Sequence, residues 1–292
     1  WPDSLAAPIA SVSRDYTKEK PANDEVFAAY RSFYSYDRTD LKAAAELVDD
    51  SARHWRREKI TFNAAYGNER VIVHLFLPKG AAPPYQTVVY FPTTGARFAR
   101  SSEELELAFI EFLVRAGRAV LYPVYAGMYE RRVDPSLLTP SFRRDQVIQW
   151  SKDFSRSIDY LETRPDIDRH RLAYFGFSLG GIYGPLLTAI DGRIQASVQL
   201  GGGFLPGKAP PEVDPLHFAP RAKEPVLMIA GRHDFVRPVE TCQTPMYRLL
   251  GAPATDKRLA LFDTGHVVYP GPEVIKEILD WLDRYLGPVK TK

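Results

Sequence analysis

The chain has 292 residues, of which 45% are hydrophobic, and its 38 basic residues nearly balance 36 acidic ones to give a net charge of +2. This length can bury a substantial core as one domain, and the small net charge gives no reason to expect nucleic acid or a membrane surface as a partner. Cys242 is the only cysteine, which excludes an internal disulfide, and no apolar run is long enough to span a bilayer.

The first 52 residues are expected to form an arm and a helical lead-in. Residues 1–20 are polar and contain prolines, which is typical of a loosely held arm. Residues 24–50 have helical stretches with several aromatic side chains, so we expect them to pack on the main domain at 53–288. No signal peptide is recognised, but the chain begins at Trp1 rather than methionine. An upstream segment and the compartment therefore both stay open.

From residue 59 onward the pattern predicts an α/β domain. Residues 59–62 and 71–77 read as strands on either side of a turn at 66–69, which predicts a hairpin. After the hairpin, short apolar runs alternate with helical periodicity, as in the stripe from Val147 to Leu161. Such alternation predicts a mostly parallel sheet with helices on both faces.

The strongest chemical signal is Gly-x-Ser-x-Gly around Ser178. An apolar strand over residues 172–177 runs into this motif, and a helical segment follows it. A serine on a tight strand-to-helix turn presents its hydroxyl at the carboxyl edge of the sheet, and small residues at 176 and 180 let the two arms pass closely. The alternative is an ordinary glycine-rich turn. The flanking elements favour Ser178 as a nucleophile, with the backbone N–H of Leu179 facing the reacting oxygen.

A nucleophilic serine predicts an acid and then a histidine further along the chain. Asp234 follows the buried strand over residues 225–230, and His266 follows the next strand. Two competitors exist. Asp263 is closer to His266 in sequence, but we interpret it as a strand-ending residue that bonds local backbone, and we interpret His233 as a loop residue. The remaining histidines, which we interpret as structural or solvated, are His54, His74, His170 and His217.

A second oxyanion donor is expected from the loop after the strand over residues 86–91. Many esterases carry His-Gly there, whereas this chain has Pro92, Thr93 and Thr94. Because a backbone N–H does the work, proline in the histidine position removes nothing essential. We predict the amide of Thr94 as the donor, with Thr93 as the fallback and an ordinary polar turn as the alternative.

Two loops bear on specificity. Residues 122–144 are rich in arginine and tyrosine and follow a strand, so Tyr125, Tyr129 and Arg131 are expected to contact the substrate. The alternative is a solvated basic loop that is pinned by its own acidic residues. Residues 201–224 are too few for a large helical cap domain, which predicts an accessible, shallow cleft.

The elbow Gly-x-Ser-x-Gly-Gly and the order serine, aspartate, histidine resemble the α/β-hydrolase superfamily, in its dienelactone-hydrolase-like and acyl-peptidase-like branch, over roughly residues 55–286. The resemblance implies an eight-stranded sheet and makes residues 53–288 a catalytic domain. Dienelactone hydrolases proper use cysteine as nucleophile, so Ser178 argues against that specific activity. More narrowly, residues 83–92, 125–132 and 280–286 resemble the hydrolase domain at the carboxyl end of some bacterial serine/threonine protein kinases.

These features together predict a serine hydrolase that cleaves carboxylic esters with small to medium acyl chains. A small-molecule ester is the expected partner, while its identity and the oligomeric state stay open. Three alternatives are a peptidase of the acyl-peptidase type, an acyltransferase, and a non-catalytic sensor or interaction module with a hydrolase shell. The sequence has no His-x-x-x-His or Cys-x-x-Cys pair and no Gly-x-Gly-x-x-Gly opening a helix, so no metal or cofactor is predicted.

Overall fold

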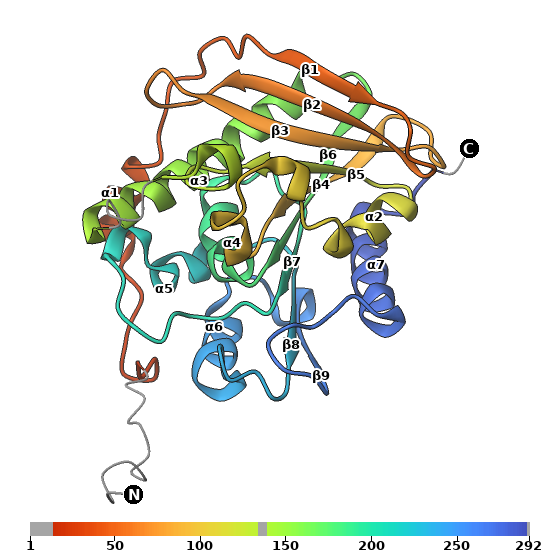
Figure 1. The fold of residues 1–292 in the computed structure, drawn as a ribbon. Helices are drawn as coiled ribbons and strands as arrows, with labels where there is room; N and C mark the ends of the chain where they lie inside the picture. Colours follow the sequence, from red (N-terminus) through yellow and green to blue (C-terminus); the bar gives the residue numbers. More distant parts are fainter. Residues whose placement is uncertain (1–13, 134–138, 291–292) are drawn as a thin grey trace, which may run out of the picture.

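The structure is a computed structural model that describes residues 14–133 and 139–290. These residues form a central nine-stranded sheet in the order β1-β2-β3-β5-β4-β6-β7-β8-β9 (Figure 1). The strands are β1 (Ala44–Asp49), β2 (Trp55–Asn63), β3 (Arg70–Pro78), β4 (Tyr85–Phe91), β5 (Ala119–Val124), β6 (Ile167–Phe177), β7 (Ala196–Leu200), β8 (Val226–Gly231) and β9 (Lys257–Phe262). The pairs from β1 to β5 are antiparallel, and those from β5 through β9 are parallel.

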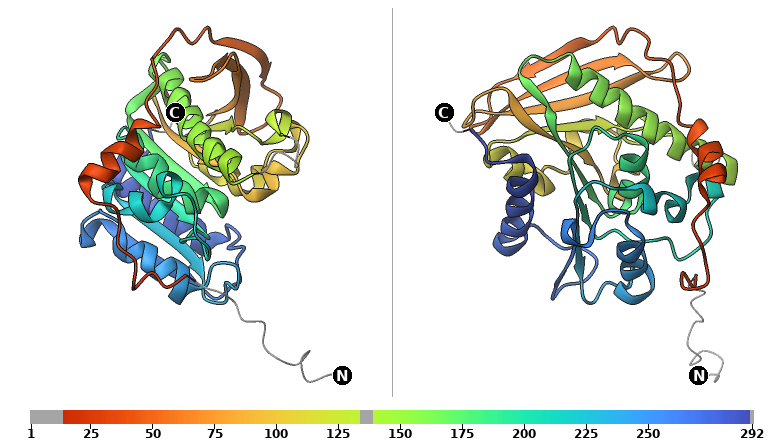
Figure 2. Two further views of the ribbon diagram at one scale, coloured as in Figure 1. Left: turned by 90° about the vertical axis from the view of Figure 1, so that its left-hand side faces the viewer. Right: turned by 180° about the vertical axis from the view of Figure 1, so that it is seen from behind.

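Helices cover both faces of the sheet (Figures 1 and 2). On one face lie α2 (Glu111–Arg115) and α7 (Pro272–Leu286), and on the other lie α3 (Pro140–Glu162), α4 (Leu179–Ile190) and α6 (Thr244–Leu249). Strands β5, β7 and β8 are buried along their whole length. Burial on both faces explains why these strands are continuous apolar runs rather than alternating ones. The predicted α/β fold with helices on both faces is confirmed.

The sheet has nine strands rather than the expected eight. The additional strand is β1, which lies in a region that we expected to be helical and pairs with β2 at the edge of the sheet. Its residues are almost all exposed, so they carry no buried stripe from which a strand could be read. Main-chain pairing with the free edge of β2 decides the conformation of β1. The boundary predicted at residue 52 therefore falls between β1 and the strand with which it pairs.

The lead-in helix is present as α1 (Asp24–Ser32). Asn23 is its N-cap, and the side chain of Asn23 accepts a hydrogen bond from the amide of Val26. The predicted loose arm is wrong for its described part, residues 14–20, while residues 1–13 lie outside the described residues. Arg14 bonds Asp214 at 2.6 Å, and the ring of Tyr16 is 6% exposed. Buried contacts therefore anchor this segment to the body.

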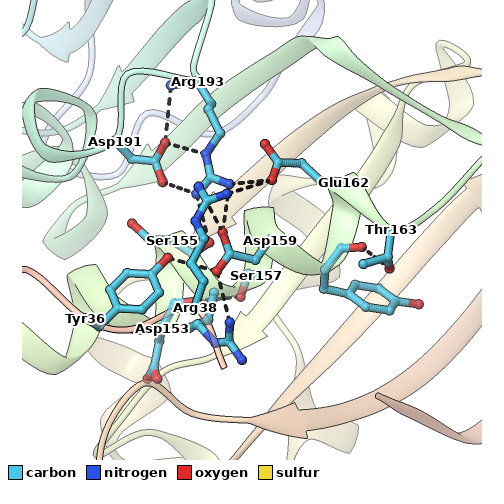
Figure 3. Close-up of polar contacts among 12 residues, drawn as sticks. Tyr36, Arg38, Asp153, Ser155, Ser157, Asp159, Glu162, Thr163, Asp191 and Arg193 are labelled. Atoms are coloured by element: carbon cyan, nitrogen blue, oxygen red, sulfur yellow. Dashed lines mark hydrogen bonds and ion pairs between the residues drawn. The ribbon is translucent and has the colours of Figure 1, made fainter. Parts of the chain in front are cut away.

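A polar cluster ties the connection after α1 to the body (Figure 3). Arg193 donates to Asp159 on α3 at 2.8 Å and to Asp191 at 2.6 Å, and the hydroxyl of Tyr36 donates to Asp159 at 2.9 Å. Asp191 follows the C-terminal end of α4, whereas Ser178 precedes its N-terminal end. The cluster thus fixes the lead-in at the opposite end of α4 from the serine motif.

Candidate active site

The serine motif forms a strained turn between β6 and α4. The backbone of Ser178 has φ 51° and ψ −99°, in the region of positive φ that non-glycine residues rarely adopt. A side chain at position 176 would collide with the backbone of Gly180, and one at Gly180 would collide with the carbonyl of Phe91. The two glycines are therefore required for the close approach of strand, turn and helix. This is the geometry of a nucleophile elbow.

Three predicted residues meet at the carboxyl edge of the sheet. The hydroxyl of Ser178 lies 2.9 Å from Nε2 of His266, and Nδ1 of the same ring lies 2.8 Å from Oδ2 of Asp234. Ser178 follows β6, Asp234 follows β8 and His266 follows β9. Because parallel strands end at one edge, residues 88 positions apart lie within hydrogen-bond distance. The arrangement can move a proton from the serine hydroxyl to the imidazole.

Asp234 is held by more than the histidine. Its side chain is fully buried, its Oδ1 accepts from the amides of Val236 at 2.9 Å and Arg237 at 2.8 Å, and its Oδ2 also accepts from the side chain of Gln243 at 3.2 Å. A buried carboxylate needs such donors to offset its lost hydration. They fix the face that Asp234 presents to His266. Gln243 was not found from the sequence, because a lone glutamine nine positions after the acid is no signal.

The competing acid and base bond each other instead. Nε2 of His233 lies 2.7 Å from Oδ1 of Asp263, and the two side chains are 72% and 85% exposed. Asp263 is thus engaged away from His266, although it is nearer in sequence.

The loop after β4 brings an amide to the cavity of Ser178, that of Thr94, which has no hydrogen-bond partner among the described residues. Thr93 caps the 3₁₀ helix η2 (Thr94–Arg97), with its hydroxyl accepting from Gly95 at 2.9 Å. The amide of Thr93 donates to Glu106 at 3.0 Å and is therefore occupied. Thr94 is the first residue of η2, so its amide has no acceptor within the helix. Leu179 has the same position at the start of α4. The geometry therefore favours the amide of Thr94 over that of Thr93 as the second free N–H donor beside the amide of Leu179.

Glu106 organises this loop and was also missed by the sequence analysis. Its carboxylate accepts from the amide and the hydroxyl of Thr93 and, at 3.0 Å, from the hydroxyl of Tyr90 on β4. Three donors on one carboxylate hold the start of η2 against the end of β4. A single glutamate between two apolar runs gives no indication of such a role.

The three residues predicted to contact substrate from the loop after β5 do not do so in the structure. Tyr125 and Tyr129 are fully buried, and their hydroxyls bond the carbonyl of Tyr90 at 3.2 Å and the hydroxyl of Tyr122 at 2.7 Å. The Arg131 guanidinium bonds the buried Asp153 at 2.6 Å. Burial of the rings and an internal ion pair hold this loop in the core, so the prediction is wrong. Residues 134–138 of the same loop lie outside the described residues.

Ser178 opens into a cavity of about 440 Å³. Its walls are mainly apolar and are formed by Thr93, Thr94, Gly95, Phe109, Phe177, Ser178, Val236, His266 and Val267. Residues 201–224 contain only short helices, among them α5 (Pro215–Phe218), so they form no large cap.

Residues 14–133 and 139–290 contain no helix that is both long and apolar enough to cross a bilayer. In that same part of the chain, no three histidine, cysteine, aspartate or glutamate side chains are grouped so as to hold a metal ion.

Known proteins resemble this chain in sequence and in fold. A protein described as "Putative hydrolase YtaP" from Bacillus subtilis (strain 168) is 26% identical over 149 residues, which cover 46% of this chain and about half (49%) of that protein. The acetyl xylan esterase from Paenibacillus sp. R4 superposes with a TM-score of 0.68 at 18% identity, covering 96% of this chain and 100% of that one. Acetyl xylan esterase 1 from Thermoanaerobacterium sp. JW/SL YS485 gives 0.71 at 15% identity, covering 94% and 98%.

At such low identities the solved structures establish the α/β-hydrolase fold alone. The family assignment comes from sequence. The model of the family described as "Dienelactone hydrolase family" matches residues 74–263, well over half of the chain, and this span includes Ser178 and Asp234. The protein therefore belongs to the dienelactone hydrolase family.

Proposed function

We propose that this protein is a serine esterase that cleaves carboxylic esters with small to medium acyl chains through an acyl-enzyme intermediate. The observation that carries the proposal is the continuous hydrogen-bonded chain from Ser178 through His266 to the buried Asp234. His266 takes the serine proton as Oγ attacks the ester carbonyl, and Asp234 stabilises the imidazolium. The proton then passes to the leaving alcohol, and water repeats the sequence to release the acid.

The tetrahedral intermediate requires donors for its oxyanion. In this proposal the amides of Leu179 and Thr94 provide them. Both residues begin a helix, so their N–H groups have no intrahelical acceptor. The N-terminus of α4 also carries a partial positive charge that favours an anion there.

Two features support an ester of modest size. The apolar cavity of about 440 Å³ beside Ser178 has room for a short chain, and no large cap covers it among the described residues. The solved structures of similar fold include acetyl xylan esterases and a glucuronoyl esterase from Solibacter usitatus, the latter with a TM-score of 0.60 at 15% identity over 89% of this chain and 92% of that one. All of these proteins are described as esterases.

The alternatives are a peptidase of the acyl-peptidase type and a non-catalytic sensor module. The narrower resemblance to a kinase-linked hydrolase domain stays a prediction. A module that had lost catalysis would have no need to keep Ser178 in a strained backbone conformation next to an aligned histidine.

The deciding experiment measures turnover of p-nitrophenyl esters of rising acyl length beside a peptide p-nitroanilide. We expect turnover of the short and medium esters, and a loss on the order of 10⁴-fold or more in kcat for Ser178→Ala with an unchanged Tm. Ser51→Ala, at an exposed position between β1 and β2, is the matched control. Retention of more than about a tenth of the activity would contradict the nucleophile assignment. Faster cleavage of the anilide would indicate a peptidase, and an inert wild type would indicate a module.

The oxyanion assignment has its own test in Thr94→Pro. Proline is tolerated at the first residue of a helix, and Thr93 before it already has the extended backbone that a following proline requires (φ −72°, ψ 174°). The substitution therefore removes the N–H with little change in the fold, and we expect a loss of about 10²-fold in kcat. Thr94→Ala keeps the amide and should lose little. Equal activity of the two variants would exclude the Thr94 amide as a donor.

A further inference from the structure

Exposed apolar side chains gather in the two loops that carry the acid and the base. Phe235 and Val236 come directly after the acid, and Val267 and Tyr269 follow the histidine. These four side chains, which we call the apolar rim, are between 37% and 84% exposed. Single exposed apolar side chains are common, whereas a group of them beside a cavity indicates a binding surface. The other exposed large hydrophobic side chains of the described residues are Val26, Phe33, Leu47, Val48 and Phe98.

The apolar rim is continuous with the wall of the catalytic cavity. Val236 and Val267 themselves line that cavity. The ring of Tyr269 packs against Phe109, with 5.7 Å between the ring centroids, and Phe109 is another lining residue. Apolar surface therefore extends from the inside of the cavity to the exposed edge of the two loops.

The lining offers few partners to a strongly polar group. Besides His266, no acidic, basic or amide side chain of the described residues lines the cavity. The hydroxyl of Thr93 is already engaged, because it donates to Glu106 and accepts from the amide of Gly95. A group with several hydroxyls would lose water here without gaining hydrogen bonds, whereas an apolar ring would gain free energy by leaving water.

The position of His266 indicates which part of the ester meets the apolar rim. In the mechanism proposed above, its Nε2, which lies 2.9 Å from the hydroxyl of Ser178, gives a proton to the oxygen of the leaving alcohol. That oxygen must lie within hydrogen-bond distance of Nε2, while the carbonyl oxygen faces the amides of Leu179 and Thr94. Val267 is the next residue after His266 and lines the cavity. The alcohol part therefore extends from the reacting carbon toward the apolar rim.

We propose, on the basis of the esterase function above, that the apolar rim binds the alcohol part of the ester and that this alcohol carries an aromatic ring. The ring lies against Val267 and Tyr269, while the short acyl part stays inside the cavity. Tyr269 is suited to this contact because its ring is exposed and yet packed against Phe109. An aromatic face that is already held in place loses little conformational freedom when a second ring packs on it.

The test compares two isomers that carry the same ring on opposite sides of the ester. Benzyl acetate has the ring on the alcohol, whereas methyl phenylacetate has it on the acyl part. A third ester, 6-O-acetylglucose, has a polar ring on the alcohol. Hydrolysis is followed by proton release at constant pH. The wild type should prefer benzyl acetate to each of the other two by about 10-fold or more in kcat/KM, since burying much of an aromatic ring is worth about that much.

Variants of the apolar rim test whether its side chains cause this preference. Val267→Ser and Tyr269→Ser change exposed side chains, so the fold should persist, which Tm checks. Each should lower the preference by about 3-fold, and the double variant should bring it close to one. Tyr269→Phe retains the ring and should retain the preference. Val48→Ser on β1 and Phe33→Ser after α1 make similar changes at exposed positions outside the cavity lining, and both should leave the preference unchanged.

The other outcomes overturn the inference in distinguishable ways. A preference for methyl phenylacetate would mean that the apolar rim binds the acyl part, and a preference for 6-O-acetylglucose would mean that the alcohol is a sugar. A rate that rises steeply only when benzyl acetate exceeds its solubility would mean that the rim docks on an apolar interface. These results, no preference in the wild type, or a preference that survives in the double variant would each overturn the inference and leave the esterase proposal standing. If the wild type turns over no ester, both proposals are overturned.

Discussion

Two histidine–aspartate pairs bridge the same two loops, those after β8 and β9. His266 and Asp234 form one pair at 2.8 Å, and His233 and Asp263 form the other at 2.7 Å. The pairs are crossed, because each loop gives a histidine to one and an aspartate to the other. Side-chain exposure is 16% and 0% in the first pair and 72% and 85% in the second. The two pairs thus share residue types and loops and have nearly equal distances, but they differ in exposure.

The pairs differ in what surrounds them. Besides its bond to His266, Asp234 accepts hydrogen bonds from two backbone amides and from the side-chain amide of Gln243. The other ring nitrogen of His266 bonds the hydroxyl of Ser178. Water and salt screen the exposed pair, so it contributes roughly 0–1 kcal/mol to stability. A short histidine–carboxylate distance alone thus does not identify a catalytic dyad. The additional donors and the neighbouring hydroxyl of Ser178 are what distinguish the buried pair from the exposed one.

Substituting the histidine of each pair should give the largest difference in kcat between the two pairs. His266→Ala removes the base and should lower kcat on the order of 10⁴-fold or more, whereas His233→Ala should change it less than about twofold. Steady-state kinetics with a p-nitrophenyl ester measure both, and Tm checks the fold. A larger loss in His233→Ala would reassign the base.

Substituting the two aspartates comes next in size. Asp234→Asn keeps the shape of the side chain but favours the wrong histidine tautomer, so kcat should fall by roughly 10³- to 10⁴-fold. Asp263→Asn removes only a screened surface contact and should leave kcat unchanged. If Asp263→Asn proved the more damaging variant, the exposed pair would be the functional one and the comparison would fail.

Chain order and strand ends were sufficient to predict the first pair and its serine. Ser178, Asp234 and His266 each follow an apolar strand, and the carboxyl ends of parallel strands share an edge. The same reasoning wrongly placed Tyr125 and Tyr129 at the substrate, because position after a strand does not determine the direction of a side chain. Both hydroxyls bond core groups instead.

Other features depend on contacts between distant residues that no local pattern reveals. Glu106 bonds Thr93 across 13 positions, and a cavity beside α4 combines residues from η2, α3, α4 and the segment after β7. Strand β1 follows from the free edge of β2 rather than from its own exposed residues.

A third histidine sharpens the comparison by showing the effect of burial without a carboxylate partner. His74 on β3 is fully buried, and its Nε2 bonds Ser102 at 2.8 Å. Burial, with help from Arg57 and Lys59, lowers the pKa of His74 to about 4. In the unfolded chain the imidazole of His74 binds a proton near pH 6.5, whereas in the folded protein it does so only near pH 4. The neutral, buried His74 therefore makes its full contribution to the free energy of unfolding above pH 6.5, and this contribution is lost as the pH falls toward 4.

The His74 prediction is tested by urea unfolding at pH 7.5 and pH 5. In His74→Gln, the decrease in the free energy of unfolding between these pH values should be smaller than in the wild type by about 2 kcal/mol. His170→Gln, at an exposed position on β6, is the control and should leave the decrease unchanged. An equal decrease in His74→Gln and the wild type would show that His74 does not titrate in this range.

Gln243 gives the smallest and most specific test of what distinguishes the buried pair. Its side-chain nitrogen donates to Oδ2 of Asp234 at 3.2 Å and to the carbonyl of Arg237 at 2.6 Å, whereas the exposed pair has no such support among the described residues. Gln243→Met keeps the length of the side chain and removes the donor, so Asp234 should hold His266 less firmly. We expect kcat to fall by about 3- to 10-fold with little change in KM, the size of the net contribution of one ordinary hydrogen bond.

A matched variant separates this positioning role from a structural one. Gln195→Met makes the same change at an exposed site and should alter neither kcat nor Tm. Gln243→Glu would place a second carboxylate next to Asp234. Because two neighbouring negative charges repel each other, this variant should lower kcat more than Gln243→Met does. If Gln243→Met lowers Tm while kcat stays at the wild-type value, Gln243 only fills space. In that case the two backbone amides and His266 are sufficient to position Asp234, and the difference between the pairs lies in burial and in those two amides.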